Sequence, residues 1–178
     1  VDWDACGENF DRAKMPASFG AAAAMDISGT RADLIEATSL ARCNFECAWE
    51  NGFGTTLPHL AKLRAGARLL RFDARKAAVE GDVARAVEDL IAIRKMARHT
   101  AIEPIAITKL VAMAIDSLAC TEIESLAKSG LMTRAQRDAL GADFALSNLN
   151  DLFAMSDFIY GERSMLAPKM GNKVEAAA

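Results

Sequence analysis

The segment from Leu57 to Asp82 places apolar residues at alternating intervals of three and four positions. This spacing constrains the fold more than any other feature of the chain. The stripe consists of Leu60, Leu63, Ala67, Leu70, Ala74 and Ala77. Because an α-helix repeats every 3.6 residues, these side chains share one face of a single helix. Pro58 suits the first turn, Gly81 a left-handed stop, and Asp82 the N-cap of the next helix.

The same spacing predicts helices along most of the chain. Besides the helix that begins at Pro58, we expect helices from Thr30 to Gly52, from Val83 to Glu103-Pro104, from Pro104 to near Gly130, from Thr133 through Phe144, and from about Asn150 to about Met165. Thr30 and Asp33 resemble a capping box at the start of the first of these. No strand pattern is found, and the connections are short. The sequence therefore predicts an all-α fold of about six helices, packed as antiparallel hairpins in a bundle or short superhelix.

The chain divides into three parts by its pattern. Residues 1–29 show no sustained period and are predicted to form an irregular N-terminal arm, with a short helix across 21–25. Residues 30–166 form the helical domain, and residues 167–178 form a C-terminal tail. The most hydrophobic run, 105–119, is interrupted by Lys109 and Asp116. It is shorter than the roughly 20 residues that cross a bilayer, so it predicts a buried core helix and no transmembrane segment.

Composition supports helices and excludes one class of partner. The chain is 52% hydrophobic but only 6% aromatic, a balance that suits closely packed helices better than a sheet. Its 21 basic and 24 acidic residues are interspersed and give a net charge of −3. Because no basic field is present, we expect no nucleic-acid partner.

Cys43, Cys47 and His59 are the candidate metal ligands. The two cysteines lie four positions apart, on one face of the predicted helix, and His59 opens the next helix. Two thiolates and one imidazole would supply three ligands of a tetrahedral site, with His99 or Cys6 as the fourth. A cysteine on an apolar helix face is also common as a small buried side chain. In the competing interpretation, His59 lies at the start of a helix and takes part only in contacts between helices.

The four cysteines permit disulfides without requiring them. A Cys43–Cys47 bridge is disfavoured in a helix, because Cβ atoms four residues apart are about 5–6 Å from one another, whereas a disulfide needs roughly 3.5–4.5 Å. In an exported protein, a Cys6–Cys120 bridge or a bridge from the arm to Cys43 or Cys47 would fit better.

The sequence contains no recognised motif of catalytic residues. It contains no G-x-S-x-G elbow, no phosphate-binding glycine loop and no E-x-x-H pair. The acidic pairs Glu88-Asp89 and Glu122/Glu124 are predicted to be solvated helix surface. We therefore assign no catalytic or cofactor-binding residue and favour a non-enzymatic protein.

The segment from Ala78 to Ala97, AVEGDVARAVEDLIAIRKMA, resembles one helical hairpin of the tetratricopeptide type. Ala74, Ala77, Ala86 and Leu90 lie near the small and apolar positions of that motif, whereas Asp73 stands where an apolar residue is expected. No second copy follows at the interval of about 34 residues that defines the repeat.

A wider resemblance runs from about Phe45 to Arg163. It is carried by Leu57-Pro58-His59-Leu60, Gly81-Asp82, Glu103-Pro104 and Gly161-Glu162-Arg163. In these motifs the chain resembles a group of uncharacterised helical proteins of planctomycete bacteria, many of which have a membrane anchor followed by an envelope-side helical domain. The resemblance implies a helical fold and a periplasmic or cell-envelope location. Because this sequence does not include such an anchor, a cytoplasmic location stays open.

Together these features predict a non-catalytic protein-interaction or scaffold module, or a subunit of a larger complex, with a protein partner and no cofactor. Stacked helical hairpins expose grooves that bind partners. The alternative is a metal-binding or redox protein that uses Cys43, Cys47 and His59.

Overall fold

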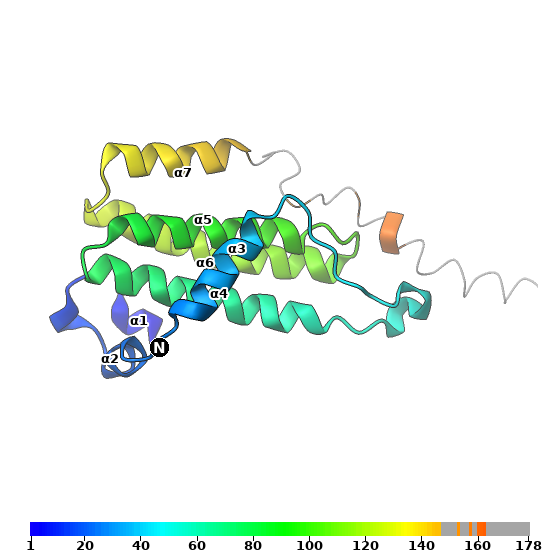
Figure 1. The fold of residues 1–178 in the computed structure, drawn as a ribbon, viewed down its shortest axis with the longest axis horizontal. Coiled ribbons are helices and arrows are strands. Elements are labelled where there is room, and N and C mark those ends of the chain that lie inside the picture. Colours follow the sequence, from blue (N-terminus) through cyan, green and yellow to red (C-terminus); the bar gives the residue numbers. More distant parts are fainter. Residues whose placement is uncertain (147–152, 154–156, 158–159, 163–178) are drawn as a thin grey trace, which may run out of the picture.

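The computed structural model describes residues 1–146, 153, 157 and 160–162, and within these residues every regular element is helical (Figure 1). The α-helices are α1 (Trp3–Cys6), α2 (Ala17–Ala23), α3 (Ser28–Ser39), α4 (Pro58–Val79), α5 (Val83–Thr100), α6 (Ala106–Ser129) and α7 (Arg134–Leu146). Two 3-10 helices, η1 and η2, span Arg12–Lys14 and Trp49–Gly54. The predicted all-α fold is confirmed.

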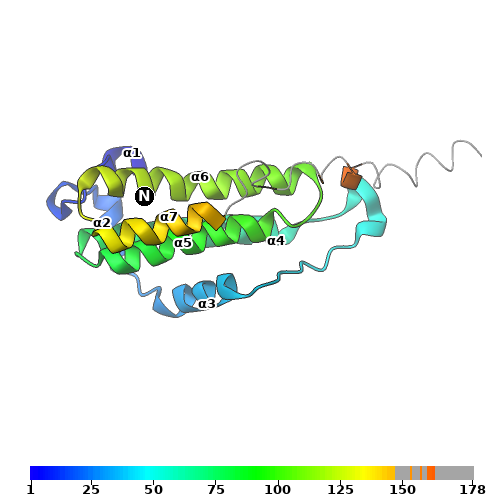
Figure 2. The ribbon, with the colours of Figure 1, turned by 90° about the horizontal axis from the view of Figure 1, so that it is seen from above.

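The long helices α4, α5 and α6 form the body of the bundle and run antiparallel to their chain neighbours (Figure 1). Helix α5 is central, since it contacts α3, α4, α6 and α7. Figure 2 shows α6 and α3 on opposite sides of the α4–α5 hairpin. The core is rich in alanine, which lets helix backbones approach closely, and its larger members include Leu70, Leu90, Ile93, Met96, Ile115 and Leu126. Most of the stripe predicted for α4 lies in this core, with Leu63 half-buried at its edge and Leu60 buried outside the cluster.

The predicted turns after α4 and α6 and the caps of α5 and α7 are confirmed, whereas α5 ends at Thr100, before the predicted Glu103-Pro104, and α6 begins at Ala106. Gly81 has a φ of 88° between α4 and α5, and Asp82 accepts a hydrogen bond from the Arg85 N–H at 3.1 Å. Gly130 ends α6 with a φ of 71°, a backbone conformation that glycine adopts most easily. Thr133 then forms a capping box with Gln136, whose side chain accepts from the Thr133 N–H at 2.8 Å.

The helix predicted from Thr30 to Gly52 is wrong in extent. Helix α3 begins at Ser28, before the expected capping box, and it ends at Ser39. Residues 42–48 have no regular structure and are followed by η2. In this segment Cys43, Phe45 and Cys47 are half-buried while the residues between them are exposed, which is the two-residue period of an extended chain. Cysteine and phenylalanine are also weak helix formers, so tertiary contacts decide the conformation.

The prediction that the run 105–119 is a buried core helix is only half right. Ile107, Leu110 and Met113 on α6 are 45–58% exposed. Lys109, which appeared to interrupt the apolar run, is fully buried and donates to the Ala101 carbonyl at the end of α5. A cation at that place satisfies a terminal carbonyl and interacts favourably with the helix dipole. In the described part of the chain, no helix has the length and apolar character needed to cross a membrane.

The N-terminal arm is partly helical and packs on the bundle. Helices α1 and α2 place Cys6 and Phe19 against Phe72 of α4, and the Arg71 guanidinium lies 4.0 Å from the centre of the Trp3 ring. Cys6 belongs to this cluster, whereas Cys120 lies near Arg94. All four cysteines are free thiols, so the Cys6–Cys120 bridge is not formed.

The predicted sixth helix lies mostly outside the described residues. Within it, Asp157 and residues 160–162 are helical, and Phe153 packs against the core. The predicted tail, residues 167–178, lies wholly outside them.

The prediction that the acidic pairs lie on the helix surface is confirmed for only one member of each pair. Glu88 and Glu124 are exposed, but Asp89 and Glu122 are buried and paired with arginines. Glu122 on α6 accepts from Arg71 at 3.2 Å and from Arg75. The sequence pattern could not show this, because the arginines that neutralise Glu122 come from a different helix.

Asp89 on α5 and Asp73 on α4 form a fully buried carboxyl pair. Arg31 of α3 lies 3.1 Å from Asp73 and 2.8 Å from Asp89, and Arg85 binds Asp73 through two nitrogens. The second oxygen of Asp89, Oδ2, is buried and has no hydrogen-bond partner among the described residues. Burial, together with the neighbouring Asp73 carboxylate, raises the pKa of Asp89 to about 8. We infer that Asp89 is protonated at neutral pH, which gives Oδ2 a proton to donate to Asp73.

This proton makes stability depend on pH. The folded protein keeps a proton on Asp89 that the unfolded chain loses above about pH 4. The contribution of this proton to the free energy of unfolding is therefore fully present below about pH 4 and is lost as the pH rises through about 8. Asp89→Asn should remove this loss, because the amide can donate to Asp73 without titrating. Urea unfolding across this pH range should show the variant gaining on the order of a few kcal/mol over the wild type at the alkaline end.

The matched control is Glu88→Gln, which neutralises the exposed neighbouring carboxylate. It should leave the alkaline loss of stability in place. An unchanged pH profile in Asp89→Asn would show that Asp89 is ionised in the native state.

Candidate metal centre

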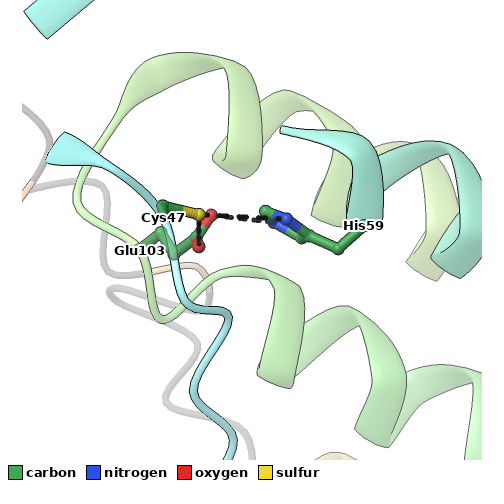
Figure 3. Close-up of side chains that lie close together, drawn as sticks. All are labelled: Cys47, His59 and Glu103. Atoms are coloured by element: carbon green, nitrogen blue, oxygen red, sulfur yellow. Dashed lines mark hydrogen bonds and ion pairs between the residues drawn. The ribbon is translucent and has the colours of Figure 1, made fainter. Parts of the chain in front are cut away.

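Three separate parts of the chain meet at one end of the bundle. Cys47 comes from the extended segment that follows α3, His59 from the first turn of α4, and Glu103 from the loop between α5 and α6 (Figure 3). Pro58 starts α4 and so fixes His59 in its first turn. Pro104 cannot continue α5, and Glu103 lies in the turn that results. Antiparallel packing of α4 and α5 brings these two ends together.

The side chains of these three residues are in mutual contact. Cys47 Sγ lies 3.3 Å from Glu103 Oε1 and 4.0 Å from His59 Nδ1. His59 Nε2 lies 3.1 Å from Glu103 Oε2. The Phe45 ring stacks on the imidazole with centroids 4.2 Å apart and an interplanar angle of 6°. The imidazole orientation is therefore held on one face by Phe45 and at its edge by the carboxylate.

The loop that carries Glu103 is firmly anchored. The buried Thr108 hydroxyl is 2.9 Å from the Glu103 carbonyl and 2.8 Å from the Ile105 carbonyl. Buried Lys109 donates to the carbonyl of Ala101. In contrast, within the described part of the chain, residues 41–46 make no backbone–backbone hydrogen bonds. The site thus joins a fixed loop to a segment that is held mainly by side-chain contacts.

The electrostatics of the site oppose formation of a free thiolate. Loss of solvent, then the hydrogen bond to Glu103 and the charge of that carboxylate, raise the pKa of Cys47 to about 11. Burial and the same carboxylate also raise the pKa of Cys43. The Cys47 thiol is therefore protonated at neutral pH and donates its hydrogen to Glu103.

The structure brings together two of the three ligands predicted from the sequence. Cys47 and His59 join Glu103 in a group whose ligand atoms all lie within 4.8 Å of one another, and Cys43 is not in it. In an extended chain, residues four apart are separated by up to about 14 Å. The fourth-ligand candidates are elsewhere: Cys6 lies in the arm cluster, and His99 bonds to the Leu40 backbone.

Glu103 is not among the ligands predicted from the sequence. Glu103-Pro104 indicated a helix break and one motif of the wider resemblance, and the partner His59 lies 44 residues earlier. A carboxylate directly after a long helix was the one available signal. This signal predicts a metal site only when the start of the preceding antiparallel helix also carries a ligand.

A thiol, an imidazole and a carboxylate could also form a nucleophilic catalytic set. Such a set requires a depressed thiol pKa, usually through a nearby positive charge. Here the carboxylate contacts the thiol itself, and the pKa of Cys47 is raised. A bound cation would reverse this effect by replacing the thiol proton. The geometry therefore favours a metal centre over a nucleophile.

Comparison with known proteins adds no family to this picture. No protein-family model, curated protein or solved structure matches the chain.

The raised pKa of Cys47 predicts slow alkylation of the metal-free protein. At about pH 8, iodoacetamide should modify Cys47 more slowly than a model thiol, since only the thiolate reacts. Glu103→Gln removes the carboxylate that stabilises the protonated thiol, so it should accelerate Cys47 modification several-fold. Peptide mass spectrometry over time gives the rate at each cysteine, and Cys120, distant from Glu103, is the internal control. A wild-type Cys47 that reacts as fast as a model thiol would contradict the assignment.

Proposed function

We propose that the protein binds one divalent transition-metal ion, of the zinc class, through Cys47, His59 and Glu103. The observation that carries this proposal is the convergence of three ligand atoms within 4.8 Å, from three separate parts of the chain. The metal-binding alternative from the sequence is thereby retained, with Glu103 in place of Cys43.

As a set, the ligand atoms lie farther apart than they would around a bound ion. Metal–ligand bonds of about 2.0–2.3 Å in tetrahedral geometry separate ligand atoms by about 3.3–3.8 Å. The 3.3 Å contact joins Cys47 to Glu103, whereas the 4.0 Å contact of Cys47 and the 3.1 Å contact of Glu103 use different nitrogens of His59. Because an ion binds one imidazole nitrogen, the relevant measure is one ligand atom per side chain, and these atoms lie within 4.8 Å of one another. The three side chains must therefore move closer together to hold the ion.

The ligand types favour zinc over calcium or magnesium. Thiolate and imidazole suit zinc and related transition metals, whereas calcium and magnesium prefer all-oxygen sites. Three protein ligands leave a fourth position for water or another ligand, as in zinc sites that exchange ligands. The ion would also tie the extended segment to the two helix ends.

Metal binding should depend steeply on pH. Because the pKa of Cys47 is raised to about 11, the ion must displace a proton from the thiol at neutral pH. Affinity should therefore increase as pH rises, and binding should release protons.

The test is metal analysis of protein purified without chelator and of apoprotein reloaded with zinc. We expect about one ion per chain and a higher melting temperature in the loaded form. Cys47→Ser, His59→Ala and Glu103→Gln should each lower the affinity at least about 100-fold, since even indirect partners of metal ligands contribute 10–100-fold. Cys43→Ser and Cys120→Ser are the matched controls and should bind normally. Wild-type protein that takes up no zinc, or a loss confined to Cys43→Ser, would refute this ligand set.

A second candidate function is the protein-interaction module predicted from the sequence. It is favoured by a groove of about 560 Å³ between α3, α5 and α7, lined chiefly by apolar side chains and bordered by Glu88 and Lys95. Its apolar walls include Ile35, Val87, Ile91, Ala92 and Ala139. An amphipathic helix of a partner protein would bury its apolar face in such a groove. The planctomycete resemblance and the cell-envelope location stay predictions.

Two exposed alanines of α7 provide a matched test of this groove. Ala139 lines it, whereas Ala142 does not. Affinity purification from the native organism, with mass spectrometry and metal analysis of the same sample, should recover a stoichiometric partner with the wild type and with Ala142→Arg. Ala139→Arg should lose that partner by filling the groove. Recovery of no partner, or equal recovery with both variants, would count against an interaction module.

A further inference from the structure

A pocket of about 340 Å³ lies between the loop before α4 and the first turns of α6. One wall is formed by Gly52, Thr55 and Leu57, and the other by Ile105, Ala106, Ile107 and Leu110. Among the described lining residues, Glu162 is the charged one. Binding sites for small molecules have volumes of about 300–1,000 Å³, are largely apolar and contain a few polar groups. This pocket is at the small end of that range.

The exposure of two lining residues points to an absent occupant. Ile107 is 48% and Leu110 is 58% exposed, although both belong to the most hydrophobic segment of the chain. Covering apolar surface is favourable by roughly 25 cal/mol per Å². A ligand with an apolar body would therefore gain affinity from both side chains.

Glu162 determines the charge that such a ligand should carry. Its Oε1 accepts a hydrogen bond from the Ala106 N–H at 2.9 Å, and its Oε2 has no partner within the described residues. The carboxylate neutralises the positive end of the α6 dipole, so that helix end does not attract an anion. A protonated amine could instead donate a charge-assisted hydrogen bond to Oε2.

The pocket and the candidate metal centre share their framework. Cys47 and His59 bracket the loop wall, and Glu103 lies two residues before Ile105 in the other wall. An ion held by these three side chains would fix one wall against the other. Metal and pocket ligand would then each strengthen the binding of the other, because coupling between two sites is reciprocal.

We propose that this pocket binds a small molecule with an apolar body and a protonated amine head, and that metal binding tightens it. The first statement is independent of the proposed function, and the second rests on it.

The experiment uses n-hexylamine as the probe, titrated into the full chain by NMR or calorimetry at neutral pH. Saturable binding is expected, with n-hexanoate binding at least about tenfold more weakly because Glu162 repels it. Glu162→Gln should weaken the amine several-fold. Leu110→Ser should also weaken it, whereas Met113→Ser, at another exposed α6 position that does not line the pocket, should not. Melting temperatures of all variants verify that they are folded.

Absence of saturable binding, equal binding of amine and carboxylate, or equal effects of Leu110→Ser and Met113→Ser would overturn the pocket assignment. The link to the metal is tested by repeating the titration with zinc-loaded, desalted protein. The link is supported if zinc loading tightens amine binding several-fold in the wild type but not in Cys47→Ser. If zinc binds without changing the amine affinity, the link is overturned and the metal centre stands. If zinc does not bind, the proposed function fails, while the metal-free titration still decides the pocket.

Discussion

The packing of α5 against both α4 and α6 is the contact on which the rest of the structure depends. Alanines at the helix contacts, among them Ala74, Ala86 and Ala119, are almost completely buried and let the three backbones approach closely. Because α4 and α5 are antiparallel, their packing places the start of α4 beside the end of α5. That arrangement alone brings His59 within 3.1 Å of Glu103. The candidate site is therefore a consequence of how the core packs.

Buried ion pairs and hydrogen bonds join the outer helices to the core. Arg31 joins α3 to the α4–α5 hairpin through an ion pair with Asp73 and a hydrogen bond to Asp89, and Asp143 of α7 accepts from Arg94 at 2.6 Å. Desolvating such charges can cost as much as their attraction returns, so buried ion pairs are weak evidence of added stability. A helix placed in a different register would leave one of these charges unpaired. We infer that the pairs fix how α3 and α7 dock on the central helices.

Most of the candidate site lies in irregular segments. Cys47 and Glu103 lie outside helices, and the pocket beside them is closed by the loop that precedes α4. Loops held by a rigid scaffold commonly carry binding residues, since their side chains can point at one another from several directions. Here the long helices supply the scaffold, and only His59 comes from a helix, at its first turn. The opposite end of the bundle is covered by the N-terminal arm, whose α1 and α2 bury Cys6 and Phe19 (Figure 2).

The sequence by itself determined which segments of the bundle are helical and where α4 and α6 end. The apolar period of α4, the stops at Gly81 and Gly130 and the caps at Asp82 and Thr133 are local properties, because each depends on residues within one or two turns. The end of α3 was not determined locally. Phe45 fits a helical period, yet it lies in a segment without regular structure and its ring stacks on His59. Burial of Lys109 and exposure of Leu110 were likewise decided by where the end of α5 lies. Glu103 became a candidate ligand only in the fold, since its contacts with Cys47 and His59 span 56 and 44 residues of chain. Helix spacing specifies which face of a segment is apolar, but the choice of neighbour for that face is made by packing in three dimensions.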